Sequence, residues 1–216
     1  MKLIKKSFSF ITAIVCCAAI SSIMPFSSSA EESVKAYGDL SYITLDSDGD
    51  GTDDYAQIVD CNETAVEVDI PAEIEGLPVK STRDWAFADC KSLTSISVPD
   101  SVNAIGNGAF SGCSSLASIN IPNSVTTIRG SAFCNCLSLT SITIPESVTS
   151  IEIAAFSGCS SLTNITIPDL VASIGDHAFY NCSSLTNITV SENNKYFSSL
   201  NGVLFNKDKT ELVTYL

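Results

Sequence analysis

The clearest candidate for site chemistry is a short acidic run at residues 46–54, Asp-Ser-Asp-Gly-Asp-Gly-Thr-Asp-Asp. It follows the start of the calcium-loop pattern D-x-[DN]-x-[DN]-G, in which alternate residues supply oxygen ligands. The five ligands would be Asp46, Asp48, Asp50, the carbonyl of Thr52, and Asp54. A hard divalent cation relieves the repulsion between these carboxylates, and a glycine at position 51 permits the sharp turn. The run therefore predicts a calcium site, and calcium is the one candidate cofactor.

Two features separate this run from a complete EF-hand. Position 12 of the loop is Gln57, where the pattern needs a bidentate Glu, and the flanking residues predict strands and not helices. A loop that lacks this ligand belongs to the weak extracellular class, with a dissociation constant on the order of 0.1 to 1 mM. A solvated acidic hairpin turn without metal is the alternative that the sequence leaves open.

The sequence offers little for catalysis. A nucleophile needs a base held beside it, and the chain has one histidine, His177. In the repeat described next, its equivalents are Trp85, Gly108, Ser131 and Ala154, so we expect His177 at the surface. The sequence therefore predicts that this protein is not an enzyme.

The dominant feature of the chain is a repeat of 23 residues. The recurring residues are Phe at 87, 110, 133, 156 and 179, Cys at 90, 113, 136, 159 and 182, Leu at 93, 116, 139, 162 and 185, and Ile at 96, 119, 142, 165 and 188. A segment of this length cannot bury so many apolar residues alone, whereas stacked copies bury identical residues on one another. The period predicts a solenoid.

Each copy contains the phrase Leu-x-x-Ile-x-Ile, whose alternation is typical of a strand with one buried face. Proline follows at 99, 122, 145 and 168 and ends the strand, because it lacks the N–H that a ladder needs. We expect a mainly β solenoid of the α/β type, a right-handed arc with short parallel strands about 4.8 Å apart on its concave face. The returning limb, through Ala-Phe-x-x-Cys, is expected to contain a turn of α-helix or 3₁₀ helix.

Two phrases carry a family resemblance. Ile-Pro-x-Ser-Val-x-x-Ile at 144–151 and Ala-Phe-x-x-Cys-x-Ser-Leu at 155–162 resemble the BspA-like, or Treponema-type, leucine-rich-repeat family. The resemblance covers about residues 66–191. It implies a secreted or cell-surface module, often bacterial, that acts in adhesion or protein binding, and it implies no enzyme.

The segments around the repeats suggest four parts. Residues 1–30 read as a signal peptide, with a basic start, an apolar middle and small residues before the cleavage point. Residues 31–65 would form an acidic N-terminal cap with a hairpin, residues 66–191 the leucine-rich-repeat domain, and residues 192–216 a C-terminal hairpin cap with turns at 201–202 and 206–209. Pro25 and interspersed serines argue against a membrane anchor, so we expect no membrane contact after cleavage.

The charge of the chain excludes one class of partner. The formal net charge is −13, and loss of residues 1–30 would remove three lysines and no acid, giving −16. Of the 24 acidic residues, 17 lie between Glu31 and Asp100. A polyanion would be repelled, so nucleic acid is not expected as a partner.

Seven cysteines follow residue 30, and five of them occupy the repeat column beside the core Phe. A small buried thiol packs there as well as a bridge would, so free thiols are favoured, although bridging between neighbouring rungs is geometrically conceivable. Cys134 belongs to a mixed column and is expected to be exposed. Cys134 with Cys136 would then be a poor metal site, because one thiol would point inward and the other outward.

The predicted strands present two outward lines of short, uncharged side chains as a candidate ligand surface. These are Ser95, Ser118, Ser141, Asn164 and Asn187 on one line, and Ser97, Asn120, Thr143, Thr166 and Thr189 on the other. Such groups cost little entropy to order and suit a polar ligand, although ordinary soluble strand residues would look the same. Trp85 is a further candidate, either exposed to hold a sugar or protein partner or packed against the acidic cap.

These features together predict a monomeric, exported binding or adhesion module for a protein or glycan at a cell surface or matrix. The alternative is a structural or assembly module in which the acidic loop is a weak, calcium-gated joint.

Overall fold

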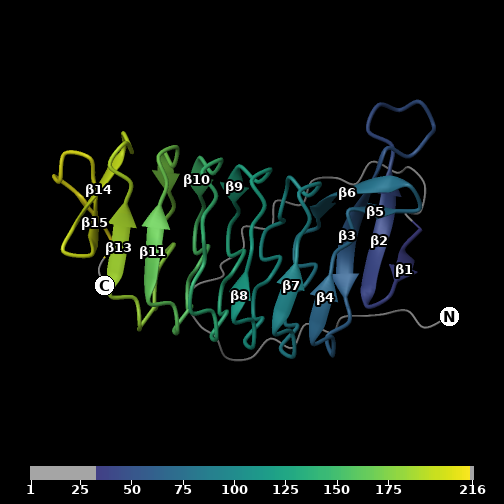
Figure 1. Cartoon of the computed structure of the whole chain (residues 1–216), viewed down its shortest axis with the longest axis horizontal. Coiled ribbons are helices and arrows are strands. Elements are labelled where there is room, and N and C mark those ends of the chain that lie inside the picture. The colour runs from purple at the N-terminus through teal and green to yellow at the C-terminus, as the bar shows by residue number, and fades with distance from the viewer. Residues whose placement is uncertain (1–32, 215–216) are drawn as a thin grey trace. The chain divides into compact units, whose positions relative to one another are not determined.

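The computed structural model describes residues 33–214, and the signal peptide predicted at residues 1–30 lies outside them. The described residues form short strands and turns without a helix (Figure 1). None of them therefore belongs to a helix long and apolar enough to cross a membrane. The mainly β solenoid is confirmed, whereas the helical turn expected on the returning limb is wrong.

The Leu-x-x-Ile-x-Ile segments form one parallel ribbon, which we call ribbon 1. Its strands are β4 (Glu67–Asp69), β7 (Ser95–Ser97), β8 (Ser118–Ile119), β11 (Asn164–Ile167) and β13 (Asn187–Val190). Pairing is in register between β4 and β7, β7 and β8, and β11 and β13, and a bridge from Asn120 to Thr143 supplies the rung between β8 and β11. Ile165 pairs with Ile188, so the period of 23 residues sets the register.

A second parallel ribbon, ribbon 2, lies on the returning limb and was not predicted. It contains β9 (Thr127–Ile128), β10 (Ser150–Ile151) and β12 (Ser173–Ile174), and a bridge between Ser81 and Ala104 precedes them. Ile128 and Ile151 are buried in the same core as the isoleucines of ribbon 1. The β-branched Val and Ile of the phrase Val-x-x-Ile were the available sequence signal.

The Ala-Phe limb makes tight turns because two residues in each repeat adopt left-handed backbone angles. The first column is Trp85, Gly108, Ser131, Ala154 and His177, with φ from 54° to 64°. The second is Asp89, Gly112, Asn135, Gly158 and Asn181, with φ from 58° to 77°. A left-handed residue ends a right-handed helix, so single turns replace it, as in the bond from Cys90 N to Phe87 O at 3.2 Å. The Gly, Asn and Asp residues of the second column are typical of this conformation.

The core stacks identical side chains along the repeat. Consecutive rings of the Phe column lie 5.0 to 5.8 Å apart, with planes within 20° of parallel. Beside them, each thiol of the repeat column from Cys113 onward donates to the carbonyl of the Phe 26 residues earlier, as Cys136 does to Phe110 at 3.2 Å. All seven cysteines after residue 30 are buried and none forms a disulfide bond, so the preference for buried thiols in the repeat column is confirmed. Burial raises the pKa of Cys182 to about 11 and that of Cys136 well above its usual range, which keeps these groups protonated as donors.

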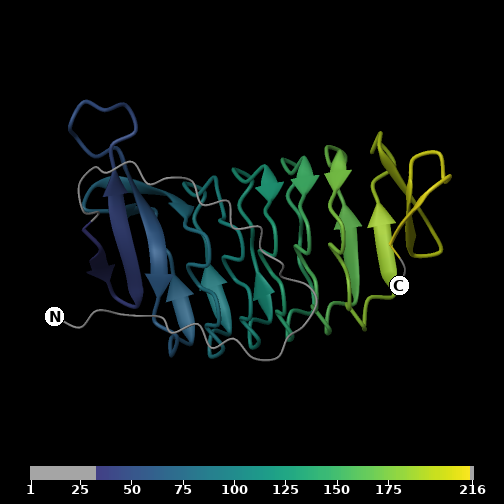
Figure 2. The same ribbon diagram turned by 180° about the vertical axis from the view of Figure 1, so that it is seen from behind.

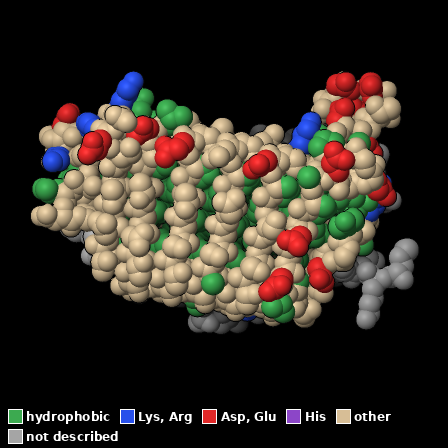
Figure 3. All heavy atoms as spheres, viewed as in Figure 1, with side chains coloured by type: hydrophobic (Ala, Val, Ile, Leu, Met, Phe, Trp, Pro, Cys, Tyr) green, Lys and Arg blue, Asp and Glu red, His purple; other side chains and the backbone are tan. Residues whose placement is uncertain are grey.

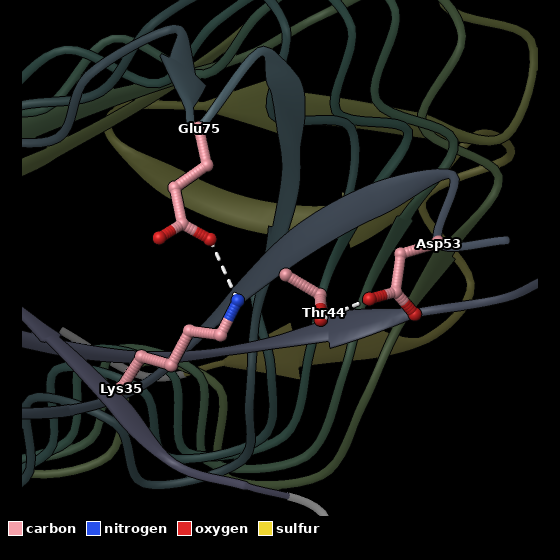
Figure 4. A network of polar contacts seen from close by, with 4 residues as sticks. All are labelled: Lys35, Thr44, Asp53 and Glu75. Carbon is pink, nitrogen blue, oxygen red and sulfur yellow. Dashed lines mark hydrogen bonds and ion pairs between the residues drawn. The ribbon is translucent and has the colours of Figure 1, made fainter.

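The N-terminal cap is a sheet of β1 (Lys35–Tyr37), β2 (Leu40–Leu45), β3 (Tyr55–Cys61), β6 (Leu77–Thr82) and β5 (Glu73–Ile74), in that order. The predicted hairpin is β2 with β3. β3 pairs in parallel with β6, and β6 leads into ribbon 2 through Ser81, so the cap extends that ribbon. The Lys35 ammonium meets Glu75 at 2.6 Å and ties β1 to the β5–β6 turn (Figure 4).

The C-terminal end is an antiparallel sheet of β14 (Phe197–Leu200), β15 (Val203–Asn206) and β16 (Leu212–Thr214). Asn201 and Gly202, at φ 51° and 83°, make the two-residue turn of the predicted hairpin, to which β16 adds a third strand (Figure 2). Fully buried Asn194 takes the place of the valines at 102, 125, 148 and 171. Its amide donates to the carbonyls of residues 168 and 171 and accepts from the N–H groups of residues 196 and 197, all at 2.7 to 3.0 Å.

Candidate binding surfaces

The two polar lines of ribbon 1 are exposed throughout, in all ten predicted residues. Parallel pairing repeats them at about 4.8 Å from one rung to the next. Among the described residues, three of the ten form side-chain hydrogen bonds: Asn164 donates to Thr163, and Asn187 donates to Thr189. The remaining hydroxyl and amide groups on these lines are directed to solvent, where a ligand can reach them.

A third polar line next to these two was missed by the sequence reasoning. It consists of Thr94, Thr140, Thr163 and Thr186, and Ala117 interrupts it in the second rung. Its hydroxyls donate to the carbonyl of the preceding rung, as from Thr186 to Thr163 at 3.3 Å and from Thr94 to Val66 at 3.0 Å. This line therefore uses its hydroxyls within the solenoid and leaves fewer of them for a partner.

Trp85 is 43% exposed, and its ring lies against Gly108 of the following rung. A Cβ atom at Gly108 would come within 2.3 Å of the indole, so the absence of a side chain there makes room for the ring. One face of the indole is used in this contact. The exposed remainder lies at the first repeat, where the array meets the cap.

The acidic run forms the exposed loop between β2 and β3, where Asp and Glu side chains gather at one end of the described residues (Figure 3). Its conformation depends on hydrogen bonds to carboxylates: Asp46 accepts the N–H of Gly51 at 2.8 Å and of Gly49 at 2.7 Å. Asp50 accepts both the hydroxyl and the N–H of Thr52. These bonds lower the pKa of Asp46 and of Asp50, because they favour the ionised carboxylate.

The structure brings together three of the five predicted calcium ligands. Oxygen atoms of Asp46, Asp48 and Asp50 lie within 4.8 Å of one another, and within residues 33–214 no other such group of three potential ligands occurs. Asp54 is not part of this group; its carboxylate accepts the hydroxyl of Ser47 and the N–H of Ser47, the latter at 2.7 Å, and these two bonds lower the pKa of Asp54. Gln57 lies outside the loop and donates to Ser81 at 2.8 Å.

His177 and Cys134 complete the set of predicted chemical residues. His177 is exposed, as expected, and its ring meets the edge of Tyr180 at 5.4 Å. The exposure expected for Cys134 is wrong, since it is only 3% exposed. In its column Ala88 and Ser111 are half-buried, Cys134 and Ser157 are buried, and Tyr180 is 51% exposed, so burial is greatest in the third and fourth rungs. Cys134 and Cys136 are therefore both inside the packed structure.

The fold and these surfaces define a leucine-rich-repeat solenoid, and comparison with known proteins agrees. The model of the BspA type leucine rich repeat region matches residues 80–207 in six copies. The chain belongs to this family.

Three solved structures illustrate the similarity. The T. pallidum leucine rich repeat protein is 34% identical with a TM-score of 0.65, over 71% of this chain and 70% of that one. A Bacteroides ovatus leucine-rich repeat protein is 34% identical with a TM-score of 0.64, over 73% of this chain and 40% of that one. A leucine rich cell surface protein of Faecalibacterium prausnitzii is 25% identical with a TM-score of 0.55, over 87% and 62%. No curated protein matches the chain.

Proposed function

We propose that this protein is a secreted or cell-surface adhesion module that binds a protein partner through the two polar lines of ribbon 1. The observation that carries the proposal is the set of ten exposed, uncharged hydrogen-bonding residues that recur every 23 residues along ribbon 1. Short hydroxyl and amide side chains lose little entropy when a partner orders them. Repeat proteins of this kind typically act as protein-interaction modules.

Export of the protein is the second part of this proposal. It is supported by the signal-peptide pattern of residues 1–30 and by the cell-surface designation of the similar F. prausnitzii protein. We propose binding without catalysis, because the one histidine lies at an exposed turn against Tyr180.

The test is capture of partners from extracellular matrix and from cell-wall material by the protein produced from the full chain. Substitution of Ser141→Arg with Asn164→Arg would place two bulky charges on ribbon 1, and we expect it to abolish specific capture. Thr149→Arg with Ala172→Arg adds the same charge to exposed positions of the returning limb and should leave capture intact. Equal capture by both double variants, or capture of glycans alone, would contradict a protein-binding ribbon 1.

We further propose that the loop at residues 46–54 binds calcium weakly and stiffens the tip of the β2–β3 hairpin. The proposal is supported by the convergence of Asp46, Asp48 and Asp50 together with the calcium-loop spacing. If the loop binds calcium, the alternative function is assembly of the protein into oligomers through a joint that calcium controls. That role requires a change of oligomeric state when calcium is added to an otherwise monomeric protein.

A further inference from the structure

Ribbon 2 carries an open polar groove next to the cap. Its larger part, about 380 Å³, is lined by residues of β3, β6 and the first repeats, including Gln57, Arg83, Gly106 and Arg129. A smaller hollow of about 210 Å³ continues it along the ribbon, shares Arg129, and reaches Glu152. The two hollows together cross several successive rungs.

The groove owes its depth to one repeat column, Arg83, Gly106 and Arg129, whose members are 23 residues apart. A Cβ atom at Gly106 would lie 2.5 Å from the backbone of Arg83, so the middle rung is a floor without a side chain. The flanking residues are the only two arginines of the whole chain. Two rungs of parallel spacing place their Cα atoms about 10 Å apart.

The acidic residues at the groove are already engaged by protein donors. Asp84 accepts the N–H of Asn107 at 2.7 Å and its side-chain amide at 3.2 Å. Glu152 accepts the N–H of Gly130 at 2.8 Å. Arg129 is exposed and, within residues 33–214, makes no ion pair or side-chain hydrogen bond. In a chain of net charge −13, this groove therefore presents a guanidinium without an acidic partner in the described structure.

We infer that the groove binds an extended acidic peptide segment of a partner protein, with a carboxylate held by Arg129 beside the floor at Gly106. A planar guanidinium binds a carboxylate through two parallel hydrogen bonds. Four rungs span roughly 15 to 20 Å, the length of five or six extended residues. Alternate side chains of such a peptide face the same way about 7 Å apart, so two acids separated by one residue can both face the groove. This site is separate from the polar lines of ribbon 1.

The experiment is an NMR titration of the protein with the peptide acetyl-Ala-Glu-Ala-Glu-Ala-amide, against the same peptide with Gln for Glu. We expect the Glu peptide to shift the amide signals of Ala104, Gly106 and Asn107, and higher salt to weaken its binding. Arg129→Gln should raise the dissociation constant at least about fivefold, since charge-assisted hydrogen bonds are lost. Lys91→Gln, which removes an exposed cation outside the groove, should not change it.

Substitution at half-buried Ala104 separates charge from bulk in the groove. Ala104→Glu should weaken peptide binding about as much as Arg129→Gln, whereas Ala104→Gln should weaken it less. Equal binding of the Glu and Gln peptides, no effect of Arg129→Gln, or no binding at all would overturn the inference. Binding of tetragalacturonate without binding of the peptide would overturn it in favour of a sugar acid. The Ser141→Arg, Asn164→Arg variant should retain peptide binding, which keeps this result distinct from the role of ribbon 1.

Discussion

The interior of the repeats and the acidic loop between β2 and β3 are held in opposite ways. Inside the repeats, Phe110, Phe133 and Phe156 are fully buried and stack ring on ring. In the loop, residues 46–53 are exposed, and carboxylates accept backbone N–H groups of the same loop. The interior depends on excluding water, whereas the loop depends on keeping its carboxylates ionised.

This difference separates the residues that maintain the fold from those free to respond to a ligand. In the interior, the same apolar contacts recur in each rung. Removal of one core side chain therefore exposes apolar surface on both neighbouring rungs as well. The loop makes its contacts within itself and can change its ion binding without disturbing the stack. Substitutions should accordingly affect stability inside the repeats and binding outside them.

The largest effect is expected from Phe133→Ala in the central rung. Phe133 is fully buried between rings at 5.5 Å on both sides, so its removal leaves a cavity and should lower the free energy of unfolding by about 3 to 5 kcal/mol. Urea denaturation followed by circular dichroism measures this. Tyr180→Ala, at a 51% exposed position, is the control and should cost much less. Equal losses for the two variants would remove the distinction between interior and surface.

The next effect is expected from Asn194→Val, which restores the residue type of its column. Val would leave two N–H groups and two carbonyls near β14 without their side-chain partner. We expect a loss of about 2 to 4 kcal/mol in the same denaturation experiment. Asn193→Ala, which removes one exposed contact to Asp169, is the control. Unchanged stability of Asn194→Val would show that the C-terminal sheet does not need this residue.

The sequence predicted the features that repeat. The Phe, Cys, Leu and Ile columns and the register of ribbon 1 follow from spacing, because identical residues in stacked copies must meet. The β2–β3 hairpin lies outside the repeats and was predicted from the strand-like segments on either side of the acidic loop. The turn at Asn201 and Gly202 was predictable from the dipeptide itself.

The sequence failed where geometry between rungs decides the outcome. The left-handed angles at Trp85, Ser131 and Ala154 were hidden by residue types that rarely adopt them, so a helical turn was expected. Cys134 looked exposed because its column is mixed, although central rungs bury it. The groove at Gly106 lies between Arg83 and Arg129, which belong to different repeats. The pattern of a single repeat therefore could not predict it.

A smaller effect is expected from calcium at the loop. With a dissociation constant of 0.1 to 1 mM, 10 mM Ca²⁺ should stabilise the protein by about 1.4 to 2.7 kcal/mol, seen as a rise in Tm. Asp48→Ala should abolish the rise, because it removes one of three converging carboxylates. Glu63→Ala, at an exposed position of the cap outside the loop, should preserve it. A rise no larger than that caused by Mg²⁺, or one that survives Asp48→Ala, would leave the loop as a solvated turn.

The smallest effect is expected from Thr143→Arg on ribbon 1, next to Ile142 in the chain. Thr143 is exposed, while Ile142 is 8% exposed and belongs to the core. An arginine at position 143 extends into solvent among uncharged neighbours, so the free energy of unfolding should change by less than about 0.5 kcal/mol. The same urea experiment measures this change. Ile142→Arg is the comparison variant, and it should unfold the protein because it places a charge in the core. A loss above about 1 kcal/mol for Thr143→Arg would mean that the outward line is packed, and its side chains would no longer be free for a partner.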